Sequence, residues 1–146
     1  MHHARHRSRR EGFSLVEVMI VLVVIGVLVS FAIPRYDRAV EQSRADVAVA
    51  NLRAIWSAQR MYWLENHAYT ADLSTLSNAG LLDASILAVG AGYSYAVPTA
   101  DASSFTATAS RSGNSQWNGT LSINENGSVS GVLQSAGNRD IVPAYQ

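Results

Sequence analysis

The sequence of 146 residues contains no cysteine and no lysine, and only 3 of its residues are prolines. Without cysteine, the chain has no disulfide, no thiolate metal ligand and no cysteine nucleophile. Outside the cytoplasm its stability would therefore have to come from packing alone. A chain of this length can form one membrane segment and one small domain, but not two full domains.

All formal positive charge comes from 11 arginines, which 11 acidic residues balance. The balance hides two opposite parts of the chain. Residues 1–12 hold four arginines and one glutamate, a net charge of +3, whereas the remainder holds seven arginines and ten acids, a net charge of −3. Because the larger part is mildly acidic, we expect no nucleic-acid partner and no anionic-membrane surface on it.

The usual sequence signatures of catalysis are also missing. Residues 65–146 contain no Gly-x-Ser-x-Gly elbow, no phosphate-binding glycine loop and no His-x-x-x-His pair. The acids of the C-terminal part do not form an Asp-x-Asp cluster; they are Asp72, Asp83, Asp101 and Asp140. We therefore expect no enzyme activity, no cofactor and no assigned metal site.

The sequence does contain a long apolar run, Phe13–Ile33. As a helix it would be about 32 Å long, close to the thickness of a bilayer's hydrocarbon core. One acid, Glu17, interrupts the run near its start. Such an acid costs about 2.5–3.5 kcal/mol at the centre of a membrane helix and less near the interface. We therefore interpret residues 13–34 as a transmembrane or filament-core helix in which Glu17 has a function and a partner.

Residues 1–12 have the composition of a positively charged leader before an apolar segment. No Ala-x-Ala type site follows the apolar run, since Pro34 comes directly after it. A run that is not removed stays as an anchor, with the arginines holding the N-terminus in the cytoplasm. His2, His3 and His6 are interpreted as solvated residues of this leader rather than metal ligands.

The stretch Gly12-Phe13-Ser14-Leu15-Val16-Glu17-Val18-Met19-Ile20-Val21 resembles the class III signal of type IV pilins and type II secretion pseudopilins. The resemblance extends from Gly12 to about Arg38. It implies cleavage by a prepilin peptidase between Gly12 and Phe13, followed by N-methylation of Phe13. Glu17 matches the family's acidic residue. Gly26 and Pro34 match the glycine and proline that weaken the family's N-terminal helix.

The resemblance also implies a structural role. The subunit would be stored in the inner membrane, with its N-terminus in the cytoplasm, and then extracted by an inner-membrane assembly machinery. Copies of the chain would form an extracellular or periplasmic helical filament, with lipid bilayer as the surroundings before assembly. Two alternatives stay open: a pseudopilin of a type II secretion system, and a minor pilin with a binding role. A membrane-tethered enzyme is least favoured.

The chemistry of Glu17 agrees with this role. After cleavage the α-amino group of Phe13 is positively charged at neutral pH, and methylation leaves it able to carry that charge. A carboxylate and an ammonium in low dielectric each need a counter-ion, so Glu17 of one copy can pair with Phe13 of the next. Such pairing sets the stagger between copies. The alternative is a Glu17 side chain that reaches the headgroups from the helix end.

Residues 35–64 are expected to continue the helix in water, so that Phe13–Leu64 forms one helix of about 78 Å. Two stripes recur at helical spacing. The first is Tyr36, Val40, Ser43, Val47, Ala50, Ala54, Ser57 and Met61, and the second is Leu52, Trp56, Gln59 and Trp63. The small residues of the first stripe suit close packing, and the tryptophans of the second suit burial under a sheet. Glu41 and Arg44 can pair at i,i+3, whereas most other charges are expected to be solvated.

Residues 65–146 are expected to form a small globular head. Thr70 is predicted to cap a short helix, Ala71–Asn78, which Gly80 ends. Four alternating runs predict an antiparallel meander, with a hairpin turn at Asn126-Gly127. The runs are Tyr93–Val97, Phe105–Ser110, Thr120–Asn124 and Ser128–Leu133. Arg111–Asn118 is expected to be a surface loop and Gly137–Gln146 an irregular tail. The fold class is therefore α+β, with one face of the sheet packed on the long helix.

Overall fold

The computed structural model describes residues 12–88, 92–112, 116–135 and 140–142, with the side chains of 32–35 left out. The chain divides into two compact units, Met1–Ala39 and Val40–Gln146, each of which is described by itself below. From here on, the second unit is called the head; it includes the part of α1 from Val40 onward as well as the predicted head, residues 65–146. The predicted leader up to residue 11, and all of the predicted tail except residues 140–142, lie outside the described residues.

One helix, α1, spans Leu15–Asn66, 52 residues. The predicted helix is thus confirmed, with both ends two residues later than expected, and it continues through Gly26 and Pro34. The helix ends at Asn66, because the next residue, His67, has a φ of 53°, outside the right-handed region; the N–H of His67 still donates to the carbonyl of Trp63 at 2.8 Å. His67 is exposed, as expected of a residue in a surface turn.

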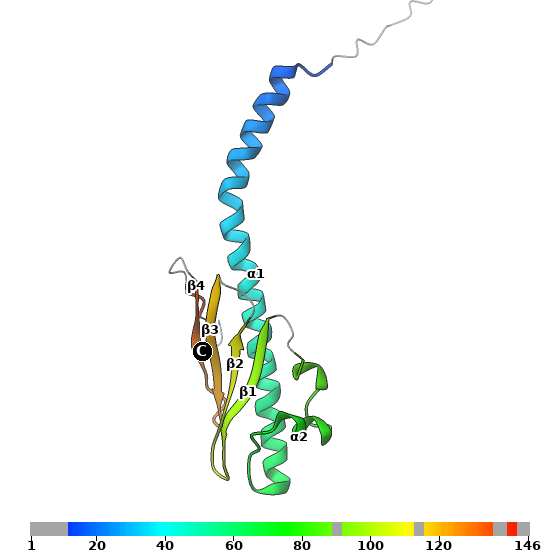
Figure 1. Cartoon of the computed structure of the whole chain (residues 1–146), viewed down its shortest axis with the longest axis vertical. Coiled ribbons are helices and arrows are strands. Elements are labelled where there is room, and N and C mark those ends of the chain that lie inside the picture. The colour runs from blue at the N-terminus through cyan, green and yellow to red at the C-terminus, as the bar shows by residue number, and fades with distance from the viewer. Residues whose placement is uncertain (1–11, 89–91, 113–115, 136–139, 143–146) are drawn as a thin grey trace, which may run out of the picture. The chain divides into compact units, whose positions relative to one another are not determined.

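The head contains a four-stranded antiparallel sheet in the order β1-β2-β3-β4, which confirms the predicted meander and the α+β class (Figure 1). The strands are β1 (Tyr93–Ala100), β2 (Phe105–Arg111), β3 (Trp117–Asn124) and β4 (Val129–Ser135). The predicted turn at Asn126-Gly127 joins β3 to β4. A bridge between Leu133 and Ile141 brings residue 141 alongside β4.

The hydrophobic core of the head lies between one face of α1 and one face of the sheet. The buried side chains on α1 are Glu41, Ala45, Ala48, Val49, Leu52, Ile55, Ala58 and Gln59. Those from the sheet are Tyr93, Val97, Phe105, Ala107, Ala109, Trp117, Leu121, Ile123 and Leu133. Residues with period 3.6 on the helix and period 2 on the strands thus meet in one layer.

The face of α1 that enters the core is the one that carries the second predicted stripe. The second stripe is right in position, because Leu52 and Gln59 are buried and Trp56 and Trp63 are half-buried. The first stripe, which was predicted only to suit close packing, faces outward: Val47 is 48% exposed and Met61 is 56% exposed. The reason is that alanines lie on both faces, while the larger Val49, Leu52 and Ile55 all lie on one. The larger apolar side chains gain more from burial and decide the face.

The two tryptophans of α1 form hydrogen bonds with the turns between the strands. Trp56 Nε1 donates to the carbonyl of Glu125 in the β3–β4 turn at 2.9 Å, and Trp63 Nε1 donates to the carbonyl of Ala102 in the β1–β2 turn at 2.8 Å. Core packing, rather than a ligand-stacking role, therefore accounts for their half-buried rings.

Trp56→Phe is expected to lower the free energy of unfolding of the head by about 1–2 kcal/mol, because the hydrogen bond to Glu125 and part of the ring contact are lost. Urea unfolding of the full chain in detergent micelles, followed by near-ultraviolet circular dichroism, measures the change. Trp63→Phe is the matched control, with an expected loss of about 1 kcal/mol or less, since its hydrogen bond is exposed. An equal loss in both variants would contradict this ranking.

The short helix after α1 starts later than predicted. α2 spans Leu73–Asn78, and its N-cap is Asp72, which accepts from Ser74 N at 2.9 Å. Thr70 was therefore wrong as the cap. The backbone of Thr70 is already held by the buried side chain of Gln59, which accepts from Thr70 N at 3.0 Å and donates to Thr70 O at 2.5 Å. The predicted end of the helix is confirmed, with Gly80 at φ 70° after the C-cap Ala79.

The predicted loop Arg111–Asn118 is shorter in the structure. Arg111 is the last residue of β2, and Trp117 and Asn118 open β3. Trp117 is buried in the core. Because the residues between the two strands are polar, the sequence pattern did not show where either strand ends. Residues 113–115 lie outside the described part of the chain. A short 3-10 helix, η1 (Ala84–Ile86), is a further element that the sequence did not predict.

Candidate functional site

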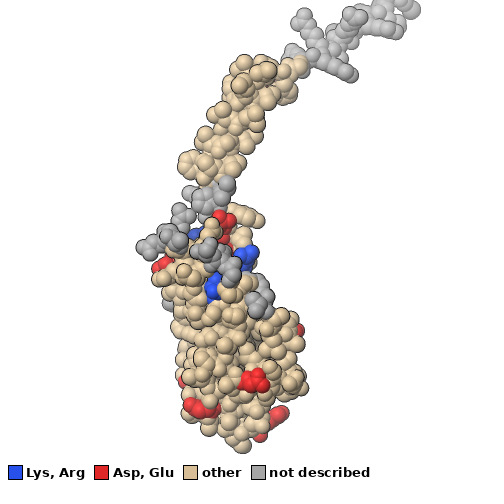
Figure 2. Space-filling view, viewed as in Figure 1, with Lys and Arg blue, Asp and Glu red and all other residues tan. Residues whose placement is uncertain are grey.

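The first unit presents an apolar helix surface. From Phe13 to Phe31 every described side chain is exposed. The helix contains an 18-residue window with a mean hydropathy of 2.9, none of it buried, so by length and composition it can cross a membrane. In the view of Figure 2 this stretch shows uncharged atoms, whereas charged side chains are scattered over the head. A surface of this kind requires lipid or other apolar helices around it.

The residues predicted to take part in processing and assembly lie together at the start of this helix. Gly12 and Phe13 precede α1 and are exposed, and Glu17 lies in its first turn. Phe13 and Glu17 are four residues apart, about one helical turn. A carboxylate in a first turn also interacts favourably with the positive end of the helix dipole. Gly26 and Pro34 lie further along α1, and space is open around Gly26, where an added Cβ would have no neighbour within 4 Å.

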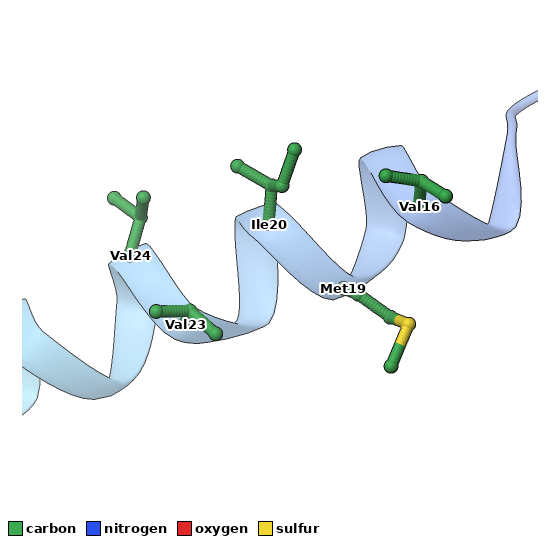
Figure 3. A pocket seen from close by; sticks show the side chains of 5 residues that line it. All are labelled: Val16, Met19, Ile20, Val23 and Val24. Carbon is green, nitrogen blue, oxygen red and sulfur yellow. The ribbon is translucent and has the colours of Figure 1, made fainter.

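A shallow groove runs along the surface of the same stretch, lined by Val16, Met19, Ile20, Val23 and Val24 (Figure 3). In the figure Ile20 and Val24 project to one side of the helix and Met19 to the other, while Val16 and Val23 lie in front of the ribbon. Rows of side chains at i,i+4 with a groove between them are the surface that a second helix packs against. The groove is apolar and belongs to one helix, so it has the shape for a neighbouring helix rather than for a polar ligand.

The head carries a second surface of this kind, which we call the outer stripe: Ser43, Val47, Ala50, Ala54, Ser57 and Met61. All six side chains are exposed. The small side chains at 50, 54 and 57 allow the backbone of another helix to approach closely. The structure of the head leaves this stripe uncovered.

The sequence reasoning missed a buried ion pair. Glu41 and Arg111, 70 residues apart, meet in the head with Arg111 Nε 2.6 Å from Glu41 Oε1. The predicted pairing of Glu41 with Arg44 is present, but at 3.5 Å and with Arg44 half-exposed. Two signals could have revealed the main pair. Glu41 is in phase with the buried Ala45, and Arg111 continues the inward alternation of Ala107 and Ala109.

The rest of the head offers little for metal or acid–base chemistry. Within the described residues no group of three or more His, Asp or Glu side chains could hold a metal ion. The pKa of Asp101 is lowered to about 2 because the backbone and side chains of Ser103 and Ser104 donate hydrogen bonds to its carboxylate. These bonds indicate that the carboxylate of Asp101 holds the turn between β1 and β2. Backbone donors likewise lower the pKa values of the helix caps Asp72 and Asp83.

An exposed apolar helix with an acid in its first turn, followed by a head of helix and antiparallel meander, defines a type IV pilin-like protein. A family profile described as a prokaryotic N-terminal methylation motif matches residues 7–33. A second profile, described as type IV minor pilin ComP, DNA uptake sequence receptor, matches residues 34–121, more than half of the chain. The chain belongs to this type IV minor pilin family.

Curated relatives carry the names of pilins and pseudopilins, which are structural proteins. The chain is similar to the type IV major pilin protein PilA of Myxococcus xanthus, with 36% identity over 46% of this chain and 30% of the relative. It is similar to the type II secretion system core protein G of Pseudomonas aeruginosa, with 36% identity over 43% of this chain and 44% of the relative. It thus spans less than half the length of either.

A third relative is matched over more of its length. The chain is similar to the type IV wide pilus major component PilA4 of Thermus thermophilus, with 29% identity over 73% of this chain and 78% of the relative. The predicted resemblance to type IV pilins and pseudopilins is therefore confirmed.

Proposed function

We propose that the chain is a structural subunit of a type IV pilus-like filament. It is held in the inner membrane by the apolar part of α1, with its N-terminus in the cytoplasm, until a prepilin peptidase cuts between Gly12 and Phe13. Phe13 is then N-methylated, and an inner-membrane assembly machinery moves the subunit into the filament. Copies of α1 form the filament core, where Glu17 of one copy meets the Phe13 amine of the next.

The observation that carries this proposal is the exposed apolar surface of α1 with Glu17 in its first turn. In a lone membrane helix the favourable interaction with the helix dipole offsets only part of the cost of a carboxylate at that position. The charge is compensated when copies are staggered so that an ammonium lies beside it. The pair then fixes the register between subunits, while the apolar surfaces supply most of the contact area.

A pilus is favoured over a type II secretion pseudopilus because the family profile that covers most of the head is that of a pilin. Shearing cells that express the chain should therefore release long fibres containing it, visible by immunogold electron microscopy. Fibres found only on overexpression of a secretion system, and not at the surface of the native cell, would favour the pseudopilus instead.

Ala54→Arg tests whether the outer stripe faces other subunits. The substitution places an unpaired charge between close-packed helices, and we expect it to lower the yield of filaments by about tenfold or more. The head should still fold, because Ala54 is exposed in the single chain. The readout is the amount of sheared filament per cell, together with the amount of processed subunit in the membrane.

Ala71→Arg is the matched control, since Ala71 is also exposed but lies outside the stripe, before α2. We expect its filament yield to match that of the wild type. Equal yields from both arginine variants would remove the outer stripe from the interface.

Nucleic acid is not proposed as a partner, although the description of the matched family names a DNA uptake receptor. The sequence after residue 12 is net acidic. Among the described arginines of the head, Arg111 is buried against Glu41. We expect no retention of double-stranded DNA by the processed protein at about 150 mM salt, where phosphate contacts are weakened. Retention that falls steeply with added salt would contradict this and establish a binding role.

A further inference from the structure

The carboxylate of Glu41 accepts hydrogen bonds from two residues of the sheet, Tyr93 and Arg111. It lies in the second residue of the head, and its side chain is 2% exposed. Arg111 Nε donates to Oε1 at 2.6 Å and Arg111 Nη2 donates to Oε2 at 3.1 Å. The Tyr93 hydroxyl donates to Oε1 at 3.2 Å. The two-point contact with a guanidinium fixes orientation as well as distance.

The guanidinium of Arg111 is equally occupied. Its Nη1 donates to the carbonyl of Gly92 at 2.8 Å and to that of Ser112 at 2.6 Å, and its side chain is 3% exposed. Burial, together with the adjacent Glu41 carboxylate, raises the pKa of Tyr93, so the phenol keeps the proton that it donates. One arginine therefore joins α1 to the residue before β1 and the residue after β2. We call Glu41, Arg111 and Tyr93 the clamp.

The clamp lies where α1 enters the head, before the larger apolar contacts of the helix begin. Among the described side chains of α1, Glu41 is the first that is buried; residues 36–39 are exposed, and Val40 is half-buried without belonging to the core cluster. The next buried side chains are Ala45 and Ala48, which contribute only a methyl group each. Larger apolar anchors begin at Val49 and Leu52. The first two turns of α1 in the head therefore have little apolar contact with the sheet, and the clamp supplies most of their attachment.

We propose that the clamp fixes residues 40–48 of α1 to the sheet and thereby sets the residue at which α1 leaves the head. Bending or unwinding of α1 is then confined to residues before Glu41. A buried ion pair is often no better for stability than apolar residues of the same size, so the contribution of the clamp is positional. Its use in assembly rests on the proposed function: heads with a fixed exit point stand at one position on the filament.

Hydrogen exchange of the unassembled full chain in detergent micelles tests the clamp. In Glu41→Gln the carboxylate is lost while the size of the side chain is kept. We expect the amides of residues 42–48 to exchange about tenfold faster than in the wild type, which corresponds to the loss of one strong local contact. Amides of residues 52–60 and of β3 should stay within about twofold.

Two further variants keep the test decisive. Tyr93→Phe removes a single hydroxyl and should accelerate the same amides by a smaller factor, even if Glu41→Gln does not fold. Asp46→Asn makes the same chemical change in the same two turns, at a partly buried carboxylate that accepts a hydrogen bond from Gln42 Nε2 at 3.1 Å, and should leave the exchange rates nearly unchanged.

Unchanged exchange at residues 42–48 in Glu41→Gln and Tyr93→Phe would overturn the proposal. So would an equal acceleration throughout the head, which marks a general loss of stability rather than a local attachment. Because the measurement uses unassembled protein, its failure would leave the filament proposal intact. Conversely, a chain that never forms filaments could still show the local effect of the clamp.

Discussion

Replacing Glu17 with alanine is expected to abolish or strongly impair filament formation while leaving membrane insertion and cleavage at Gly12 intact. The substitution leaves the apolar surface of α1 unbroken and removes the one charge of the span that can compensate the amine of Phe13. An unpaired ammonium buried among apolar helices is costly, so assembly should fail although each subunit is processed. Sheared filaments and processed subunit are counted in the same cells, the latter by the mass of its N-terminus.

Ser30→Ala is the control for this experiment. Ser30 is also a polar residue in the span, but its hydroxyl donates to the carbonyl of Val27 in the same helix at 2.7 Å and needs no partner from another copy. We expect normal filaments from this variant. Normal filaments from Glu17→Ala as well would mean that the carboxylate does not set the register, and would favour the alternative in which it reaches the headgroups.

Gly131→Ala is expected to have the largest effect on the stability of the head, a loss of about 2–4 kcal/mol in the free energy of unfolding. Gly131 lies in β4 with φ 114°, and a Cβ there would collide with the carbonyl oxygen of Thr120 and with Leu121 on β3. Both contacts are backbone atoms of a central strand, so relief requires the β3–β4 ladder to move. Urea unfolding followed by tryptophan fluorescence reports this loss, because all 3 tryptophans lie in the head.

Gly80→Ala is the control for Gly131→Ala, because it measures the cost of backbone strain without a steric collision. Gly80 follows α2 with φ 70°, but an added Cβ there would meet nothing within 4 Å. We expect a loss of about 1–2 kcal/mol, the cost of a left-handed conformation for an ordinary residue. A loss of unfolding free energy in Gly131→Ala no larger than that in Gly80→Ala would contradict the close approach of β3 and β4 at Gly131.

Much of the fold could be predicted because its strongest signals are local. The apolar run, the absence of breakers in Arg35–Leu64 and the Asn126-Gly127 turn each depend on neighbouring residues only, and all three predicted the correct element. The inward face of α1 was predicted only in part, because the second stripe includes the buried Leu52 and Gln59 but neither stripe includes the buried Glu41 and Ala45. Alanines occur on both faces, and the first stripe satisfied the helical period without being the one that the sheet covers.

The candidate functional residues likewise divide into those with a local sequence signal and those without one. Gly12, Phe13 and Glu17 were identified through the resemblance to the class III signal; the structure places Gly12 and Phe13 before α1 and Glu17 in its first turn, and their roles stay predictions. Glu41 and Arg111 were not recognised as partners, because nothing local joins residues 70 positions apart. Arg111 was assigned to a loop, since the polar residues that follow it hide the end of β2. The helix and strand periods each indicate an inward side chain, but only the tertiary fold shows that Glu41 and Arg111 meet.

Intact-mass and fragmentation analysis of the subunit purified from its native membrane tests the central claim most directly. A polypeptide that begins at Phe13, with one methyl group on its α-amino nitrogen, is the expected result. A native polypeptide that retains Met1, or one that begins beyond Pro34, would contradict processing at Gly12 and, with it, the role proposed for the apolar helix and Glu17.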